Sequence, residues 1–425
     1  MSPNEPKRKV WDFWHMLGPG LTTGAADDDP SGITTYSQAG AQFGYNMLWT
    51  AWLTFPLMAV IQEMCARIGL VTGRGLASAI RHNYSKSILY FTAILLLIAN
   101  TFNIAADLAM MSEATRLLLP INFTLLVVLF TAASLWMQIV LSYKRYAKYL
   151  KWLALILIVY VFAAFSVGIN WHQVLPQVFW PHISFDKSQL LLLTAVLGTT
   201  ISPYLFFWQT SQEVEEQILE GKISIKQRLV TSTPAEVKKM RVDVWSGMFL
   251  SNLVMFFIIA VCASTLHASG ITNITSAGQA AEALKPLAGR AAYLFFTIGI
   301  IGTGLLAVPV LAGSSSYAIS ESFGWNEGLY RKFNRAYAFY GVIIFSMVVG
   351  VIINLLGFDS VKMLIYSAVL NGLISPFILL LILLLASNKK IMKEWVNGKF
   401  SIFFGILIIL LMTVTSLFTI WTSLF

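Results

Sequence analysis

Eleven apolar runs, each about 20 residues long, follow one another along this chain of 425 residues. A run of that length can cross a bilayer as a helix, whose backbone satisfies its own hydrogen bonds. The composition agrees, since 57% of the residues are hydrophobic and only 12% are charged. We therefore predict an all-α integral membrane protein whose spans cover residues 14–41, 46–70, 88–115, 121–142, 150–169, 188–217, 243–267, 291–320, 336–355, 360–386 and 401–424.

Basic residues gather on alternate connections between these runs. If residues 1–13 lie in the cytoplasm, all but five of the 29 Lys and Arg residues fall on the cytoplasmic side. Such an excess marks cytoplasmic connections, where it meets anionic lipids. We expect a multi-pass protein of the cell membrane with a cytoplasmic N-terminus and an extracytoplasmic C-terminus. The net charge of +9 then requires no nucleic-acid partner.

Two runs carry helix-breaking residues at mid-depth. The first contains "DDDPSG" at 27–32, and the sixth contains "ISPY" at 201–204. Proline lacks an N–H and clashes with the preceding turn, so each helix should unwind just before Pro30 and Pro203. Broken helices five spans apart are typical of a five-plus-five inverted repeat with its substrate site between the breaks. We expect repeats over 14–169 and 188–386, with 401–424 as an accessory helix.

The first break carries three consecutive carboxylates, Asp27, Asp28 and Asp29. The end of a half-helix already presents free carbonyls and partial negative charge, so added carboxylates favour a cation. An ionisable side chain at this depth costs about 3 kcal/mol or more and is retained for function or paired. We therefore predict a cation site centred on Asp29. An alternative for Asp27 and Asp28 is that they line an aqueous vestibule.

The segment "GPGLTTGAADDDPSGITTYSQAGAQFG" resembles the first helix of the NRAMP divalent-metal transporters. That family reads G-P-G, then D-P-G-N, then Q-A-G-A, and the distance from Asp29-Pro30 to "QAGA" at 38–41 matches. The resemblance implies a LeuT-type fold and transport of metal ions rather than an enzyme. It implies no cofactor, because the cation is the substrate, and it assigns Asp29 as a metal ligand.

Other ligand positions of the family differ in this chain. The Asn of D-P-G-N is Gly32, and the M-P-H-N of the sixth helix reads Ser202-Pro203-Tyr204-Leu205. The Gln expected in span ten is Ala368, with Asn371 the nearest amide. The candidate metal site therefore comprises Asp27, Asp28, Asp29, Ser31, Gly32, Thr199 through its carbonyl, Ser202 and Asn371.

The departures remove the soft thioether ligand. An all-oxygen site suits hard cations, and Mg²⁺ is commonly held by one or two carboxylates with several waters kept. We expect Mg²⁺ as the first substrate and Mn²⁺ as the second. The smaller Gly32 and Ser202 side chains should also enlarge the cavity.

The third span, "ANTFNIAADLAMMSEA", resembles the family stretch E-x₆-D-L-A-E. Asp107 matches the central Asp, whereas the two Glu positions are Asn100 and Met110, and the His of M-P-H-N is Tyr204. A proton relay needs titratable groups in series. We therefore expect weak or no proton coupling. Asp107 is either an ion-path residue or a hydrogen-bonded link between helices.

Further polar residues lie outside the two breaks. We expect Glu213, Glu215 and Glu216 to form a solvated helix end, or else to attract cations there. Packing roles are expected for Asn252, Ser314 to Ser316, Asn354, Cys65 and Cys262. A monomer or loose dimer in membrane lipid is expected. One rival remains, a LeuT-fold Na⁺- or H⁺-coupled symporter of a small organic solute, while the paired breaks disfavour a membrane enzyme or scaffold.

Overall fold

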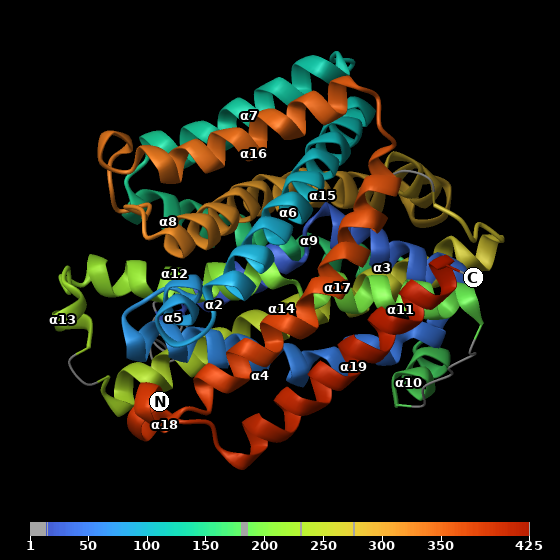
Figure 1. The fold of residues 1–425 in the computed structure, drawn as a ribbon. Coiled ribbons are helices and arrows are strands. Elements are labelled where there is room, and N and C mark those ends of the chain that lie inside the picture. Colours follow the sequence, from blue (N-terminus) through green and yellow to red (C-terminus); the bar gives the residue numbers. More distant parts are fainter. Residues whose placement is uncertain (1–13, 15, 180–185, 230–231, 275–276, 425) are drawn as a thin grey trace, which may run out of the picture.

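A computed structural model describes residues 14, 16–179, 186–229, 232–274 and 277–424. Within these ranges the regular structure is entirely helical (Figure 1). The helices of the bundle are α2 (Pro19–Asp27), α3 (Pro30–Phe43), α4 (Leu48–Thr72), α6 (Lys86–Leu118), α7 (Phe123–Val140), α8 (Tyr143–Leu153), α9 (Ile158–Ser166), α11 (Lys187–Thr200), α12 (Pro203–Leu219), α14 (Pro234–Thr265), α15 (Ala277–Phe323), α16 (Tyr337–Leu355), α17 (Ser360–Ala386) and α19 (Lys399–Leu424). Short helices are α5 (Leu76–Asn83), α10 (Trp171–Phe179), α13 (Ile225–Arg228) and α18 (Lys389–Met392), and 3₁₀ turns cover Gly44–Met47, Ala154–Leu157, His267–Ser269, Phe333–Arg335 and Lys393–Trp395.

Ten helical stretches of the described chain are long and apolar enough to cross a membrane. The count is one below the prediction because α3, a 3₁₀ turn and α4 run on as one stretch, Pro30–Thr72. Gly44 makes the corner with a φ of +60°, a conformation that favours glycine. The first two predicted spans therefore meet at a turn instead of a loop.

Both predicted breaks are confirmed. Helix α2 ends at Asp27 and α3 begins at Pro30, while α11 ends at Thr200 and α12 begins at Pro203. Each proline is the first residue of the second half-helix. The N–H at that position has no partner within a helix, so its absence in proline costs no hydrogen bond.

Two helices begin well before their predicted spans. Helix α14 begins at Pro234, because Thr233 and Glu236 form a reciprocal capping box, with the Glu236 carboxylate accepting from the Thr233 amide at 2.7 Å. Helix α15 begins at Ala277, so the last part of the connection predicted before residue 291 is helical. Hydropathy locates the buried part of a helix but not its polar extension.

Helix α14 packs closely along both half-helices of the first span. A Cβ atom at Gly20 would lie 2.5 Å from the Val244 amide nitrogen, and one at Gly24 would overlap the backbone of Gly247. Small residues permit this approach of two backbones inside a membrane. Figure 1 shows α7 and α16 side by side along one edge of the bundle, with the broken helices towards its middle.

Two asparagines make interhelical hydrogen bonds, as expected. The Asn354 side-chain amide donates to the Ala105 carbonyl at 2.8 Å. The Asn252 side-chain oxygen accepts from the Thr54 hydroxyl at 2.7 Å.

Candidate metal site

The two breaks face each other across the bundle. The Tyr204 hydroxyl, from the first turn of α12, donates to the Ala26 carbonyl in the last turn of α2 at 2.8 Å. The Tyr36 hydroxyl of α3 lies 3.0 Å from the Thr200 hydroxyl of α11. Ser314 of α15 donates to the Tyr204 carbonyl at 2.6 Å, which agrees with its expected packing role. The unwound segments are therefore joined by buried tyrosines.

Asp29 lies in the first break and is 3% exposed. Its Oδ1 accepts from the Gly32 amide at 2.7 Å, so Asp29 is the N-cap of α3. Its Oδ2 accepts from the Asn103 side-chain amide of α6 at 2.8 Å. Asn103 in turn accepts from the Ser367 hydroxyl of α17 at 3.0 Å. Three helices thus set the position of this carboxylate.

Asp107 lies one turn after Asn103 on α6 and is fully buried. It interacts electrostatically with Asp29 and lies near the Ser31 amide. Within the described chain, neither of its carboxylate oxygens has a hydrogen-bond partner. Asp107 thus lies between α6 and the first turn of α3, and both its role in an ion path and its role as a link between helices stay predictions.

Asp27 and Asp28 are buried, with exposures of 1% and 0%. The Asp27 Oδ2 accepts from the Ser251 hydroxyl of α14 at 2.8 Å. Its Oδ1 and both oxygens of Asp28 have no partner among the described residues. In this conformation both side chains are enclosed by the helices, and the aqueous vestibule stays an alternative prediction for them.

The second break supplies hydroxyl and carbonyl oxygens. The Ser202 hydroxyl donates to the Gly198 carbonyl at 2.8 Å and to the Thr199 carbonyl at 2.6 Å. The two carbonyls share the single hydroxyl proton of Ser202, and one of them is the Thr199 carbonyl expected to serve as a ligand. Ser375 links Asn371 to the break, since its hydroxyl donates to the Asn371 and Ile201 carbonyls at 2.7 and 3.1 Å. The side-chain oxygen of Asn371 is buried without a partner in the described chain.

Gly32 does not enlarge the cavity, and that expectation is wrong. A Cβ atom at this position would lie 2.9 Å from the Asp27 carbonyl and 3.3 Å from the Tyr36 ring. The first turn of α3 packs closely against the end of α2, so the break has no room for an asparagine without a shift. The Ser31 carbonyl is also engaged, since it accepts from the Thr35 hydroxyl at 2.9 Å.

The unpartnered oxygens around the breaks come from Asp27, Asp28, Asp107 and Asn371. Buried polar atoms in native proteins are normally satisfied by protein, water or an ion. No group of three or more His, Cys, Asp or Glu side chains in the described part of the chain converges closely enough to hold a metal. The arrangement instead offers separate carboxylates with hydroxyl and carbonyl oxygens, which fits a cation that keeps part of its water.

Sequence reasoning missed Asn103, Ser251 and Ser367, which bond to the aspartates or to each other. Asn103 carried a signal, because its position four residues before Asp107 places both side chains on one face of α6. Ser251 and Ser367 carried none, since each reaches the site from a helix distant in sequence.

The expectation of a solvated end at Glu213, Glu215 and Glu216 is wrong for the first two, which are 7% and 1% exposed. The Glu215 Oε1 accepts from the Tyr317 hydroxyl at 2.5 Å and the Leu329 amide at 2.7 Å, and Oε2 from the Tyr330 amide at 3.1 Å. Glu215 therefore binds the connection between α15 and α16 to α12. Cys65 and Cys262 are buried and free, as expected of packing residues.

The paired breaks, the helix order and the buried carboxylates define a multi-pass membrane protein with a LeuT-type fold. The family described as "Natural resistance-associated macrophage protein-like" matches residues 20–422, and the chain belongs to this Nramp family. The family's members are membrane transporters rather than enzymes, which agrees with expectation.

Sequence relatives extend over nearly the whole chain. The chain is 26% identical over 393 residues to the divalent metal cation transporter MntH of Klebsiella pneumoniae, covering 90% of this chain and 88% of the relative. It is 26% identical over 412 residues to MntH of Yersinia enterocolitica, with coverage of 93% and 92%.

Solved structures share the fold. The manganese transporter of Eremococcus coleocola, in complex with an aromatic bis-isothiourea substituted compound, superposes with a TM-score of 0.75 at 19% identity, covering 97% of this chain and 87% of that one. Mhp1, a nucleobase-cation-symport-1 family transporter in a closed conformation, gives a TM-score of 0.57 at 14% identity, with coverage of 96% and 93%. At these identities the likeness concerns the fold alone.

Proposed function

We propose that this protein is a secondary transporter that moves divalent metal cations across the membrane by alternating access, with Mg²⁺ preferred to Mn²⁺. The relatives named as divalent metal cation transporters support the class of substrate. The two half-helix breaks support a substrate position between them at mid-depth. The proposed site comprises Asp29, Asp107, Asp27 and Asp28, with Thr199, Ser202 and Asn371 at the second break.

One observation carries the preference for a hard cation. Buried side-chain oxygens without a partner in the described chain include those of Asp27, Asp28, Asp107 and Asn371, beside the two breaks. Position 202, where the family supplies a thioether, carries a hydroxyl. Oxygen ligands suit Mg²⁺, and a shortage of converging carboxylates suits an ion that sheds its water reluctantly.

The surroundings of the site support weak or absent proton coupling. Asn100 donates its side-chain amide to the Leu311 carbonyl at 3.2 Å and to the Ser315 hydroxyl at 2.9 Å, so a structural contact replaces a titratable group. Met110 cannot titrate, and the Tyr204 hydroxyl is engaged with the Ala26 carbonyl. A chain of proton-exchanging groups is therefore interrupted at three positions.

Uptake by the purified protein in liposomes tests the substrate. We expect saturable Mg²⁺ uptake, competition by Mn²⁺, and weaker competition by Ca²⁺, because the larger ion prefers more ligands. Liposomes without protein are the control. If divalent cations are not taken up but Na⁺ drives accumulation of a small organic solute, the symporter alternative replaces this proposal.

The same liposomes test coupling with a pH-sensitive dye enclosed in the lumen. Mg²⁺ uptake should leave the luminal pH unchanged. An inward proton gradient, applied with the membrane potential clamped, should not increase accumulation, because the relay is interrupted. Metal-dependent acidification that scales with uptake would contradict the coupling proposal while leaving the substrate proposal intact.

A further inference from the structure

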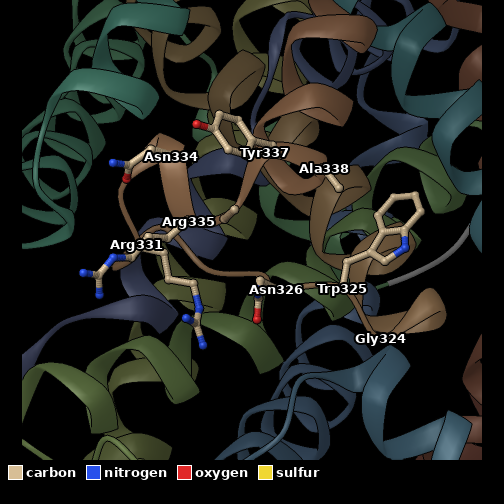
Figure 2. Close-up of a pocket in the computed structure, with 9 residues that line it drawn as sticks. Gly324, Trp325, Asn326, Arg331, Asn334, Arg335, Tyr337 and Ala338 are labelled. Carbon is tan, nitrogen blue, oxygen red and sulfur yellow. The ribbon is translucent and has the colours of Figure 1, made fainter.

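A cavity of about 700 Å³ lies apart from the metal site, at the connection between α15 and α16. Its lining includes Trp325, Asn326, Arg331, Asn334, Arg335 and Tyr337. None of the nine described lining residues is acidic. Figure 2 shows the two arginines on one side of the pocket, Trp325 on the other and Asn326 between them. Two guanidinium groups with two amides form a donor-rich surface suited to phosphate oxygens.

Further positive charge lies beside this cavity. The Arg81 guanidinium of α5 packs directly against Gly324, another lining residue with a φ of +72°. Acidic side chains lie nearby as well: Glu327 interacts electrostatically with Arg331, Arg228 and Arg81, and also with Glu215 and Glu321. The Arg331 Nε donates to the Glu327 carbonyl at 3.1 Å, and its guanidinium lies 4.9 Å from the centre of the Tyr330 ring. Arg331 is thus held in place, while Arg335 is exposed at the pocket wall.

The start of α16 adds to the attraction for an anion. Tyr337 and Ala338, the first residues of this 19-residue helix, line the cavity. Ala336 occupies the N-cap position, and no side chain of the described chain caps the helix. The first N–H groups of an uncapped helix carry partial positive charge and bind anions readily.

Exposed aromatic rings surround the pocket. Trp325 stacks on Phe323 with ring centres 5.1 Å apart, and Phe323 stacks on Tyr90 at 4.9 Å. Phe333 and Tyr337 pack edge to face at 5.3 Å. Trp325 and Tyr337 are 41% and 63% exposed. Exposed aromatic residues at the ends of spanning helices are typical of the membrane–water interface, which favours a lipid over a soluble ligand.

We propose that this pocket binds the phosphate-bearing headgroup of an anionic phospholipid in the leaflet that faces the predicted cytoplasm. Arg331, Arg335 and the start of α16 contact the phosphate, while the rings of Phe323 and Trp325 lie at the interface beside the acyl chains. The proposal is independent of which ion the protein carries.

The same connection is attached to the broken sixth span. The Leu329 and Tyr330 amides donate to Glu215 of α12, and the Tyr340 hydroxyl donates to the Arg331 carbonyl at 2.7 Å. A bound headgroup therefore stabilises the segment that holds α12 in this conformation. This link connects the lipid to the inner half of a helix that carries the second break.

Native mass spectrometry of the full chain in detergent tests the proposal. The probes are dioleoylphosphatidylglycerol, dioleoylphosphatidylcholine and soluble glycerol 3-phosphate. Wild type should retain phosphatidylglycerol in preference to phosphatidylcholine, and Arg335→Gln should weaken that retention about fivefold, as expected for one surface cation near an anionic lipid. Arg335→Lys should restore part of it, and Arg331→Gln with Arg335→Gln should abolish the preference.

Lys332→Gln is the matched control, because Lys332 lies on the same connection but does not line the pocket. It should retain phosphatidylglycerol like wild type. An equal loss in Lys332→Gln would identify diffuse surface charge and overturn the pocket. Equal retention of the two lipids by wild type would overturn it too. Arg335-dependent binding of glycerol 3-phosphate as strong as that of the lipid would replace the lipid with a soluble phosphate.

Discussion

Asp29→Asn should lower the apparent affinity of Mg²⁺ uptake by at least about 100-fold, and the protein should remain folded. Two unit charges about 4 Å apart attract each other by about 4 kcal/mol at an effective dielectric constant of 20. A 100-fold loss of affinity corresponds to about 2.8 kcal/mol, so losing most of this attraction is enough to cause it. The asparagine oxygen can still accept from the Gly32 amide, so the N-cap of α3 is preserved. The measurement is the concentration dependence of uptake in liposomes, together with the melting temperature.

Asp359→Asn provides the matched control for this substitution. Asp359 caps α17 by accepting from the Lys362 amide at 3.0 Å, the same three-residue spacing as in Asp29. It is exposed and distant in sequence from the breaks. Asp359→Asn should therefore transport like wild type. Near-normal uptake by a folded Asp29→Asn protein would rule out Asp29 as a ligand.

Ser202→Met should shift the ion preference towards Cd²⁺, by about tenfold relative to Mg²⁺. The substitution removes the hydroxyl whose proton the Gly198 and Thr199 carbonyls share. It also adds a soft thioether at the second break, and soft ligands favour Cd²⁺ and late transition metals over Mg²⁺. Competition by Cd²⁺ against Mg²⁺ uptake is the measurement.

Ser202→Leu controls for size and for the lost hydroxyl, because leucine resembles methionine in volume but has no sulfur. It should not gain Cd²⁺ affinity. If leucine and methionine behave alike, or if wild type already prefers Cd²⁺ to Mg²⁺, the loss of sulfur does not set the preference of this protein. Gly32 is left unchanged in this design, since a Cβ there would lie 2.9 Å from the Asp27 carbonyl.

The membrane-spanning class, both breaks and the central carboxylate follow from local sequence. Apolar length defines the spans because a helix satisfies its own backbone in lipid. Pro30 and Pro203 define the breaks because each ring excludes the preceding helical hydrogen bond. Asp27, Asp28 and Asp29 stand out because an ionisable side chain at mid-depth is costly, and the resemblance to the family motif singles out Asp29 among them. These are properties of a residue and its near neighbours, so they are readable without the fold.

The tertiary structure alone decided how those residues are held. Asn103, Ser251 and Ser367 come from three different helices, and only the packing of those helices brings them to the aspartates or to one another. Close packing of α3 against α2 removed the space predicted at Gly32. Burial of Glu215 against the Leu329 and Tyr330 amides overturned its prediction as a solvated residue. The contacts of Ser251, Ser367 and Glu215 join segments far apart in sequence, and the space at Gly32 depends on how the chain turns between α2 and α3, so only the folded structure shows them.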